Sequence, residues 1–279
     1  MAPLAFHRFG DFEVAAVSDG VLHASYDPFR NIDRADAVRL VGRPDSGIGS
    51  VPIEVRAFLV RLQDKLMLVD AGSGNTMGPT LGKLADNLRS GGIDPRDITH
   101  VLLTHIHPDH SNGLVDDCDR PIYTHAEILV HENDAGFWLD REPDARDNEF
   151  MRRNLSAARR VLMPYGERLR RVRDGEVLAG ISAHLQAGHS PGHTGWLLRA
   201  GSEPLLFWGD IVHVAPIQFA RPQATLIYDL DQNAAAASRA RVLDWVATDR
   251  IRVAGAHLEG SGIGHVVRRG SGYAFEPST

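Results

Sequence analysis

A cluster of histidines around one aspartate is the part of the sequence best equipped for chemistry. Four candidate metal ligands, His105, His107, Asp109 and His110, fall within six residues, directly after a short apolar segment. Imidazole and carboxylate groups are the ligands that Zn²⁺ and similar metals prefer. Because Pro108 disfavours a helical backbone at the residue before it, we expect a loop that turns these side chains in different directions. The segment therefore predicts a metal site.

Three further donors stand near the ends of predicted strands. Asp210 and His257 each follow a short apolar stretch, and His193 lies in a segment rich in glycine. Open α/β sheets usually place their ligand sites at the carboxyl ends of strands. We therefore expect these three side chains to converge on the histidine cluster.

Strands and helices alternate around these donors. Amphipathic helices and short strands are expected throughout, without a linker rich in Pro, Gly or Ser, which favours a single α/β domain of layered sheets covered by helices. The predicted strands cover residues 55–62, 66–69, 101–104, 177–185, 196–199, 205–208 and 251–256, and the predicted helices cover 81–88, 151–162 and 231–248.

The composition narrows the classes of function. The chain has 279 residues, of which 43% are hydrophobic and 24% charged, as in a packed globular protein. A net charge of -6 works against binding nucleic acid or an anionic membrane. We expect no membrane span and no signal peptide, because no apolar run is long enough. A single cysteine, Cys118, excludes an intrachain disulfide and fits the cytoplasm.

The order of the donors resembles the metallo-β-lactamase superfamily. The motif H-x-H-x-D-H at residues 105–110, a later His, a later Asp and a last His follow its pattern from about Val51 to the C-terminus. The resemblance implies an α/β fold with the four-layer αββα sandwich. It also implies one hydrolase domain over residues 1–279, with the segment before Val51 as an N-terminal extension.

The resemblance further implies two divalent metal ions per chain, with zinc expected. Three histidines would hold one ion, an aspartate and two histidines would hold the other, and a second aspartate would bridge them. In that order the residues are His105, His107 and His193; Asp109, His110 and His257; and Asp210. Asp70 would orient a ligand histidine, although an aspartate that simply ends a strand is the alternative.

A metal pair of this kind predicts hydrolysis. Metal binding lowers the pKa of water to about 7, so a bridging hydroxide could attack a small ester, lactone or organophosphate triester. Asp109 could pass a proton to the leaving group. The segments Phe137-Trp138, Gln218-Phe219 and 256–265 look like methyl parathion hydrolase, with N-acyl homoserine lactonases as near neighbours. Phe137, Trp138 and Phe219 are the expected substrate pocket, with plain core residues as the alternative.

His213 departs from both of these branches. Lactonases carry a tyrosine three residues after the bridging aspartate, where it hydrogen-bonds the substrate carbonyl, whereas this chain carries His213. An imidazole there could donate a hydrogen bond to the substrate oxygen, which would make His213 a catalytic residue beside Asp109 and Asp210. The alternative is a surface residue that the strand end turns away from the site.

Two other functions stay open. An RNA-processing nuclease of the same fold could use the arginine-rich segment 152–173, although a solvated helix face paired with neighbouring acids is the favoured explanation of those charges. A metal-bound protein could also sense a ligand without turnover. A serine nucleophile at Ser190 is disfavoured, because a strand and not a helix follows it. We expect a small-molecule substrate and no nucleic acid or membrane partner, and a homodimer is left open.

Overall fold

Two seven-stranded β-sheets form the centre of the molecule. The computed structural model describes residues 4–199, 201 and 203–278. The first sheet runs in the order β1 (His7–Phe9), β2 (Phe12–Ala24), β4 (Val51–Leu62), β5 (Lys65–Val69), β6 (His100–Leu102), β7 (Glu127–His131) and β8 (Leu169–Val172). The second runs in the order β16 (Gly272–Pro277), β15 (Ile263–Arg269), β14 (Arg252–Ala254), β12 (Leu205–Phe207), β11 (Thr194–Leu198), β10 (Ile181–Leu185) and β9 (Gly175–Leu178).

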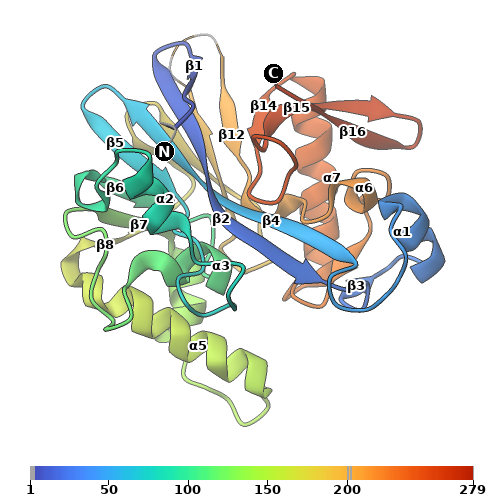
Figure 1. Cartoon of the computed structure of the whole chain (residues 1–279), viewed down its shortest axis with the longest axis horizontal. Helices are drawn as coiled ribbons and strands as arrows, with labels where there is room; N and C mark the ends of the chain where they lie inside the picture. The colour runs from blue at the N-terminus through green and yellow to red at the C-terminus, as the bar shows by residue number, and fades with distance from the viewer. Residues whose placement is uncertain (1–3, 200, 202, 279) are drawn as a thin grey trace.

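Helices cover the outer face of each sheet (Figure 1). On the side of the first sheet lie α2 (Leu84–Ser90), α3 (Pro108–Ser111), α4 (Glu132–Ala135) and α5 (Glu149–Leu162), and on the side of the second lies α7 (Gln232–Thr248). A smaller lobe holds α1 (Arg34–Val41), α6 (Ala215–Gln218) and the ribbon of β3 (Phe29–Arg30) and β13 (Thr225–Leu226). The expected four-layer αββα sandwich is confirmed. In the described part of the chain, no helix is long and apolar enough to span a bilayer.

The apolar core between the sheets holds them together. Phe58 and Met67 from the first sheet pack in one cluster with Trp196 and Phe207 from the second, and the rings of Phe58 and Phe207 lie 5.5 Å apart. All four side chains are buried. Burial of each such side chain stabilises the fold by about 1.5–3 kcal/mol, so this layer fixes one sheet against the other.

The first 24 residues include β1 and β2, two strands of the first sheet, and the following residues contribute β3 and α1 to the smaller lobe. Strand β2 pairs antiparallel with β4 from Phe12 opposite Leu62 to Ala24 opposite Val51, with one register shift near Ser18. The predicted N-terminal extension therefore shares the sheet and the core of the rest of the chain.

Most predicted elements are present at nearly the expected positions. The strands predicted over 55–62 and 66–69 are β4 and β5, which pair as a hairpin, and the helix predicted over 231–248 is α7. The prediction of a single strand over 177–185 is wrong, because this segment forms a hairpin of the two strands β9 and β10. Gly180 turns the chain there with a φ of 76°, a conformation that suits glycine.

The loop predicted over residues 105–110 is correct only for its first half. His107 is extended, with φ -112° and ψ 159°, as expected for a residue before proline. The next four residues form the short helix α3, with Pro108 at its first turn. Proline is well suited to that position because it lacks an amide hydrogen that would go unpaired.

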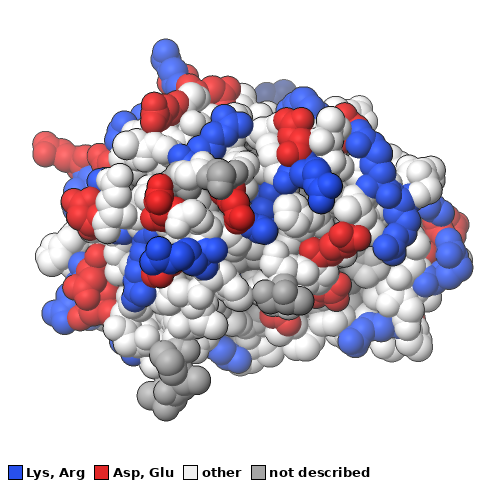
Figure 2. Space-filling view, turned by 90° about the horizontal axis from the view of Figure 1, so that it is seen from above, with Lys and Arg blue, Asp and Glu red and all other residues white. Residues whose placement is uncertain are grey.

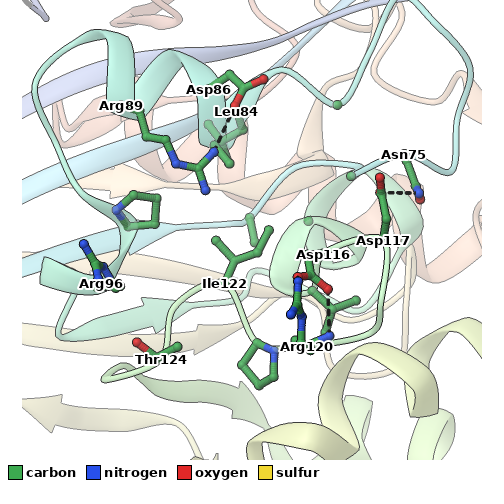
Figure 3. A pocket seen from close by; sticks show the side chains of 18 of the residues that line it. Asn75, Leu84, Asp86, Arg89, Arg96, Asp116, Asp117, Arg120, Ile122 and Thr124 are labelled. Atoms are coloured by element: carbon green, nitrogen blue, oxygen red, sulfur yellow. Dashed lines mark hydrogen bonds and ion pairs between the residues drawn. The ribbon is translucent and has the colours of Figure 1, made fainter.

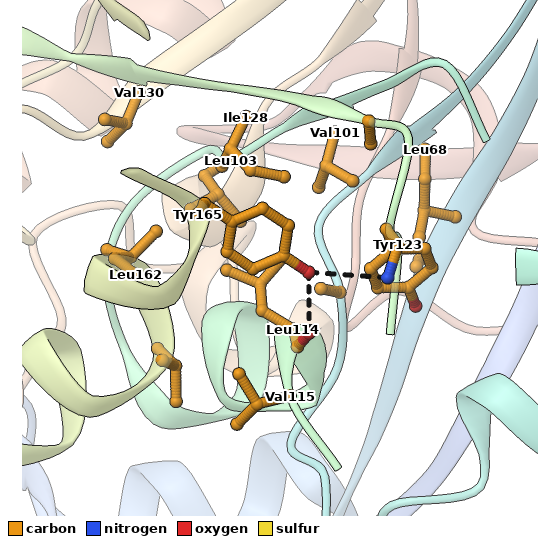
Figure 4. Packing of buried hydrophobic residues seen from close by; sticks show 14 of the residues in the cluster. Leu68, Val101, Leu103, Leu114, Val115, Tyr123, Ile128, Val130, Leu162 and Tyr165 are labelled. Atoms are coloured by element: carbon orange, nitrogen blue, oxygen red, sulfur yellow. Dashed lines mark hydrogen bonds between the residues drawn. The ribbon is translucent and has the colours of Figure 1, made fainter. Parts of the chain in front are cut away.

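A second cluster packs the helical layer onto the first sheet (Figure 4). Tyr165 lies inside it, and its hydroxyl donates a 2.6 Å hydrogen bond to the carbonyl of Leu114. This bond ties the chain after α5 to the segment that follows the metal-ligand motif.

We expect Tyr165→Phe to lower the free energy of unfolding by about 0.5–1.5 kcal/mol, because one buried hydrogen bond is lost while the carbonyl of Leu114 still accepts the N–H of Ile122. Urea unfolding followed by circular dichroism measures the change. Tyr273→Phe, on partly buried β16, is the control and should have little effect. An equal stability of both variants and the unmodified protein would contradict this role of Tyr165.

Candidate metal centre

The donors meet at one edge of the sandwich because the strands before them run parallel. Strand β5 is parallel to β6, and β12 is parallel to β14. Asp70 directly follows β5, while the H-x-H-x-D-H motif begins three residues after β6. Asp210 and His257 each lie three residues beyond the strands β12 and β14. Carboxyl ends of parallel strands share an edge, which is where this fold places its polar side chains.

The first donor group consists of His105, His107 and His189. Their ligand atoms all lie within 4.8 Å of one another, and all three residues are buried. Nδ1 of His107 faces Nε2 of His189 at 2.9 Å. Three imidazoles so close together match a metal site rich in nitrogen donors.

The second donor group consists of Asp109, His110, Asp210 and His257, again with ligand atoms within 4.8 Å of one another. The carboxylate of Asp210 faces both groups. Its Oδ1 lies 3.0 Å from Nε2 of His110 and 3.1 Å from Nε2 of His257. Its Oδ2 lies 3.1 Å from Nε2 of His189. One oxygen toward each group is the arrangement expected of a bridging carboxylate.

Unpaired polar atoms show that these residues fit metal ions. Five buried atoms of the two groups have no hydrogen-bond partner among the described residues, namely Nε2 of His105, His107, His110 and His257 and Oδ1 of Asp210. A buried polar atom without a partner costs about 1–3 kcal/mol. Divalent cations in the centre of the cluster would satisfy several of these atoms at once, since buried donor sets of this kind are usually paired or coordinate metals.

Buried carboxylates orient the histidines from behind. Oδ2 of Asp70 lies 2.8 Å from Nδ1 of His110, and Oδ1 accepts the backbone N–H of Thr104 at 2.7 Å. Asp70 has a φ of 63°, unusual for a residue other than glycine. The contact matches the predicted orienting role of Asp70, since a carboxylate on the second ring nitrogen fixes which nitrogen is free to bind metal.

His189 has the same kind of support from Asp229. Oδ1 of Asp229 lies 2.7 Å from Nδ1 of His189. Burial alone would lower the pKa of His189, but the hydrogen bonds to Asp210 and Asp229 raise this pKa to about 9. Metal binding would therefore displace a proton from His189. Sequence reasoning missed Asp229, which lies 40 residues away along the chain.

The prediction of His193 as a ligand is wrong in this structure. Nε2 of His193 accepts the backbone N–H of Asp210 at 2.9 Å, and its Nδ1 lies 3.2 Å from the carbonyl of Gln186. Both ring nitrogens are thus used within the protein. Burial lowers the pKa of His193 to about 3, which keeps the ring neutral and able to accept.

His193 instead supports the backbone of the bridging residue. A Cβ at Gly209 would lie 2.5 Å from Nε2 of His193, so only glycine allows the two segments to approach. The histidine that joins the cluster is His189, four residues earlier in the same glycine-rich segment. The repeated Gly-His pair in residues 188–193 was the available signal, and the sequence did not show which of the two rings points inward.

Asp134 connects the two loops that carry the first donor group. Its carboxylate accepts hydrogen bonds from the N–H of Ile106 at 2.8 Å, the N–H of Gly192 at 2.6 Å and the hydroxyl of Ser190 at 2.6 Å. Burial raises the pKa of Asp134, although these donors counteract the effect. The residue therefore sets the distance between the motif and the glycine-rich loop, and sequence reasoning missed it.

Charges within the cluster are strongly perturbed. Burial lowers the pKa of His105 and His107 well below the usual range. Burial acts in the same direction on His110, but the carboxylates of Asp210 and Asp109 outweigh it and raise its pKa well above the usual range. Neutral imidazoles are the form that binds metal, so His105 and His107 are already in their ligating state at neutral pH, whereas His189 must first lose a proton.

Comparison with known proteins identifies this arrangement. Residues 51–272 match the model of the metallo-beta-lactamase superfamily. The chain belongs to that superfamily. This match confirms the resemblance seen in the donor pattern and places the chain in a superfamily of metal-dependent hydrolases.

Solved structures of this superfamily share the whole fold. The hydrolase AbOPH is 28% identical, with a TM-score of 0.93 over 100% of this chain and 98% of its own. AidC, a dizinc quorum-quenching lactonase, is 24% identical with a TM-score of 0.92 over 100% and 98%. The AidC likeness shows the fold alone.

A curated relative matches over a shorter length. The acyl-coenzyme A thioesterase MBLAC2 of Gallus gallus is 30% identical over 169 residues, which cover 56% of this chain and 57% of that protein. The chain thus matches little more than half the length of this relative.

A cavity of about 250 Å³ is lined by residues of both donor groups. His213 lies in its wall, with Nε2 2.9 Å from Oδ2 of Asp210 and its ring stacked on that of His257 at 5.4 Å. The side chain of Gln218 fixes this position by accepting the N–H of His213 at 2.7 Å. Of the two alternatives for His213, the structure shows the one that faces the site.

The predicted substrate pocket is wrong in its residues. Trp138 is fully buried with its ring edge against His107, and Phe137 packs on Trp138. Phe219 stacks on Phe275 on the outer side of the second sheet. The apolar wall of the cavity is formed by other residues, namely Leu22, Ala24, Pro28, Phe29, Ile53, Met77, Phe150, Leu226 and Tyr228.

A larger hollow of about 1190 Å³ lies elsewhere, beside α2 (Figure 3). None of the donor-cluster residues lines it. Its charged side chains are paired, as in Arg89 with Asp86 and Arg120 with Asp116. The larger hollow is therefore not the candidate active site. The smaller cavity is, because donor-cluster residues line it.

We expect His189→Ala to lose about one of two metal equivalents, because it removes a nitrogen from the first donor group. His193→Ala should keep closer to two equivalents, since the ring supports Asp210 without facing the centre. Elemental analysis of both variants, purified in parallel without chelator, measures the difference. Greater metal loss in His193→Ala than in His189→Ala would reverse the assignment.

Proposed function

We propose that this chain is a dinuclear metal-dependent hydrolase of small neutral esters, lactones or organophosphate triesters. The proposal is carried by the position of Asp210, whose two carboxylate oxygens face two separate donor groups at the base of an apolar cavity. Zinc is the proposed metal because both groups are rich in imidazole nitrogen. The hydrolase AbOPH, alike in fold and 28% identical, supports the reaction class.

The cavity favours a neutral substrate. Its lining is mostly apolar and contains no lysine or arginine. A phosphate-rich or otherwise polyanionic substrate would lack the basic partners that usually hold such groups. A small acyl or aryl group would instead bury against Phe29, Ile53 and Met77. A substrate like that of a methyl parathion hydrolase or a lactonase is consistent with this lining.

The chain's own residues divide the work of hydrolysis. Bound divalent ions would polarise the substrate oxygen and lower the pKa of water to about 7. Asp210 holds the two donor groups in register through its two oxygens. His213, beside Oδ2 of Asp210, can donate a hydrogen bond to the substrate oxygen as negative charge develops. Asp109 lines the cavity and can pass a proton to the leaving group.

The charged surface supports a small substrate over RNA. Arginines of the segment 152–173 are largely engaged by neighbouring acids or carbonyl groups. The ion pairs are Arg153–Glu149, Arg159–Glu142, Arg160–Asp119, Arg170–Glu127, Arg171–Asp140 and Arg173–Glu132. Figure 2 shows blue and red side chains interleaved over another face of the molecule. Paired charges leave little net positive field for a polyanion.

Substrate screening of the zinc-loaded protein tests the proposed function. We expect lactones, aryl esters or phosphotriesters to be hydrolysed far better than β-lactams or RNA, because the cavity is small and apolar. Initial rates on matched concentrations of each class measure the preference. Faster RNA cleavage that weakens steeply with salt would support the nuclease alternative. Binding without turnover across the whole panel would support a ligand sensor.

We expect His213→Ala to lower turnover about 10-fold or more, because a positioned hydrogen-bond donor is lost. Metal content should stay unchanged, and His213→Tyr should restore part of the rate on lactones. Steady-state kinetics together with elemental analysis measure both effects. A loss of metal in His213→Ala would make His213 a ligand and contradict the proposed role.

A further inference from the structure

Tyr228 places a hydroxyl group in the apolar wall of the catalytic cavity. It lines the cavity together with Asp109 and His213, and its ring lies 6.2 Å from that of Phe150, tilted by 36°. The side chain is half-buried. Within the described residues, the Tyr228 hydroxyl has no hydrogen-bond partner in the protein, so it is free to bind a ligand.

The backbone around Tyr228 is held in place. The preceding residue, Ile227, donates its N–H to the carbonyl of Pro28 at 2.9 Å. The following residue, Asp229, accepts the N–H of Leu226 at 2.9 Å and contacts His189 through its other oxygen. Ordering of this kind reduces the entropy lost when a side chain binds a ligand.

Two other polar side chains outside the donor cluster line the cavity. The hydroxyl of Ser25 donates to the carboxylate of Asp27 at 3.0 Å, and His213 is assigned above to the reacting oxygen of the substrate. Tyr228 is therefore the hydroxyl of the wall that is available to a substrate. Burial and the nearby Asp109 carboxylate both raise its pKa, so the phenol keeps its proton at neutral pH.

We propose that Tyr228 donates a hydrogen bond to a second acceptor oxygen of the substrate, outside the bond that is cleaved. It thereby selects acyl substrates that carry a carbonyl or amide oxygen in addition to the reacting ester. The inference rests on the proposed function for the identity of the reacting group. The physical reason for selection is that, with His213 assigned to the reacting oxygen, the wall offers no other donor to such an oxygen, and a buried acceptor without a partner weakens binding.

Binding of two unreactive ligands tests the proposal without relying on turnover. Both are five-membered lactams, in which a ring N–H replaces the ester oxygen and resists hydrolysis. One carries a hexanoylamino side chain and the other an alkyl side chain of equal length. Isothermal titration of the zinc-loaded protein should show about 10-fold tighter binding of the amide-bearing lactam, as expected for one hydrogen bond.

Tyr228→Phe removes only the hydroxyl and should abolish this difference between the two lactams. Tyr273→Phe, in β16 on the far side of the second sheet, is the matched control and should keep it. Equal affinities in the unmodified protein, or a preference that survives in Tyr228→Phe, would overturn the proposal.

Kinetics separate this proposal from the proposed function. On the corresponding lactones, Tyr228→Phe should lose about 10-fold in kcat/KM only with the amide-bearing substrate, at unchanged metal content. If no lactone, ester or phosphotriester of the screen is hydrolysed while the lactam preference depends on Tyr228, the proposed hydrolysis fails and the role of Tyr228 stands.

Discussion

The site depends on one constraint, namely that several polar atoms are buried at the same point without partners of their own. Nitrogen atoms of four histidines and an oxygen of Asp210 converge at the edge of the sandwich without hydrogen bonds in the described structure. A protein interior tolerates such groups only when something compensates their loss of water. Divalent cations would provide that compensation, and the position of Asp210 between the two donor groups is the reason we propose two of them. The fold brings these atoms together, and buried carboxylates orient the histidine rings.

Buried carboxylates make the convergence possible. Asp70 and Asp229 each hold a histidine of one donor group from behind, and Asp134 ties together the loops that carry the first group. These three aspartates come from distant parts of the chain, after β5, in α4 and after β13. Without them the rings could rotate, and a ring turned by one rotamer no longer offers its nitrogen to the centre. The geometry of the site therefore depends on residues that contact the ligands or the loops that carry them.

The substrate cavity is assembled from parts unrelated to the metal motif. Strand β2 and the β3 ribbon, both in the first 50 residues, supply Leu22 and Phe29, while α5 and the segment after β13 supply Phe150 and Tyr228. The matched family segment starts at residue 51, so part of this wall lies outside it. Residues that line the cavity thus come partly from segments other than those that carry the donors, so the wall can vary on this fold without a change in the donor set.

The sequence by itself determined the superfamily, the α/β class and six of the seven ligand positions that the structure places in the two donor groups. These donors stand in a short motif or directly after predicted strands, where local pattern and chain direction fix their place. Tertiary structure alone decided between His189 and His193, because both follow a glycine in the same loop. The choice depends on which ring contacts the carboxylate of Asp210 and which ring accepts the backbone N–H of Asp210.

Tertiary structure also decided which residues form the wall of the cavity. Phe137, Trp138 and Phe219 have the right composition for a pocket, but packing turns their side chains into the core or onto a remote face. Side-chain direction follows from contacts between segments far apart in the sequence, and local pattern carries no information about those contacts.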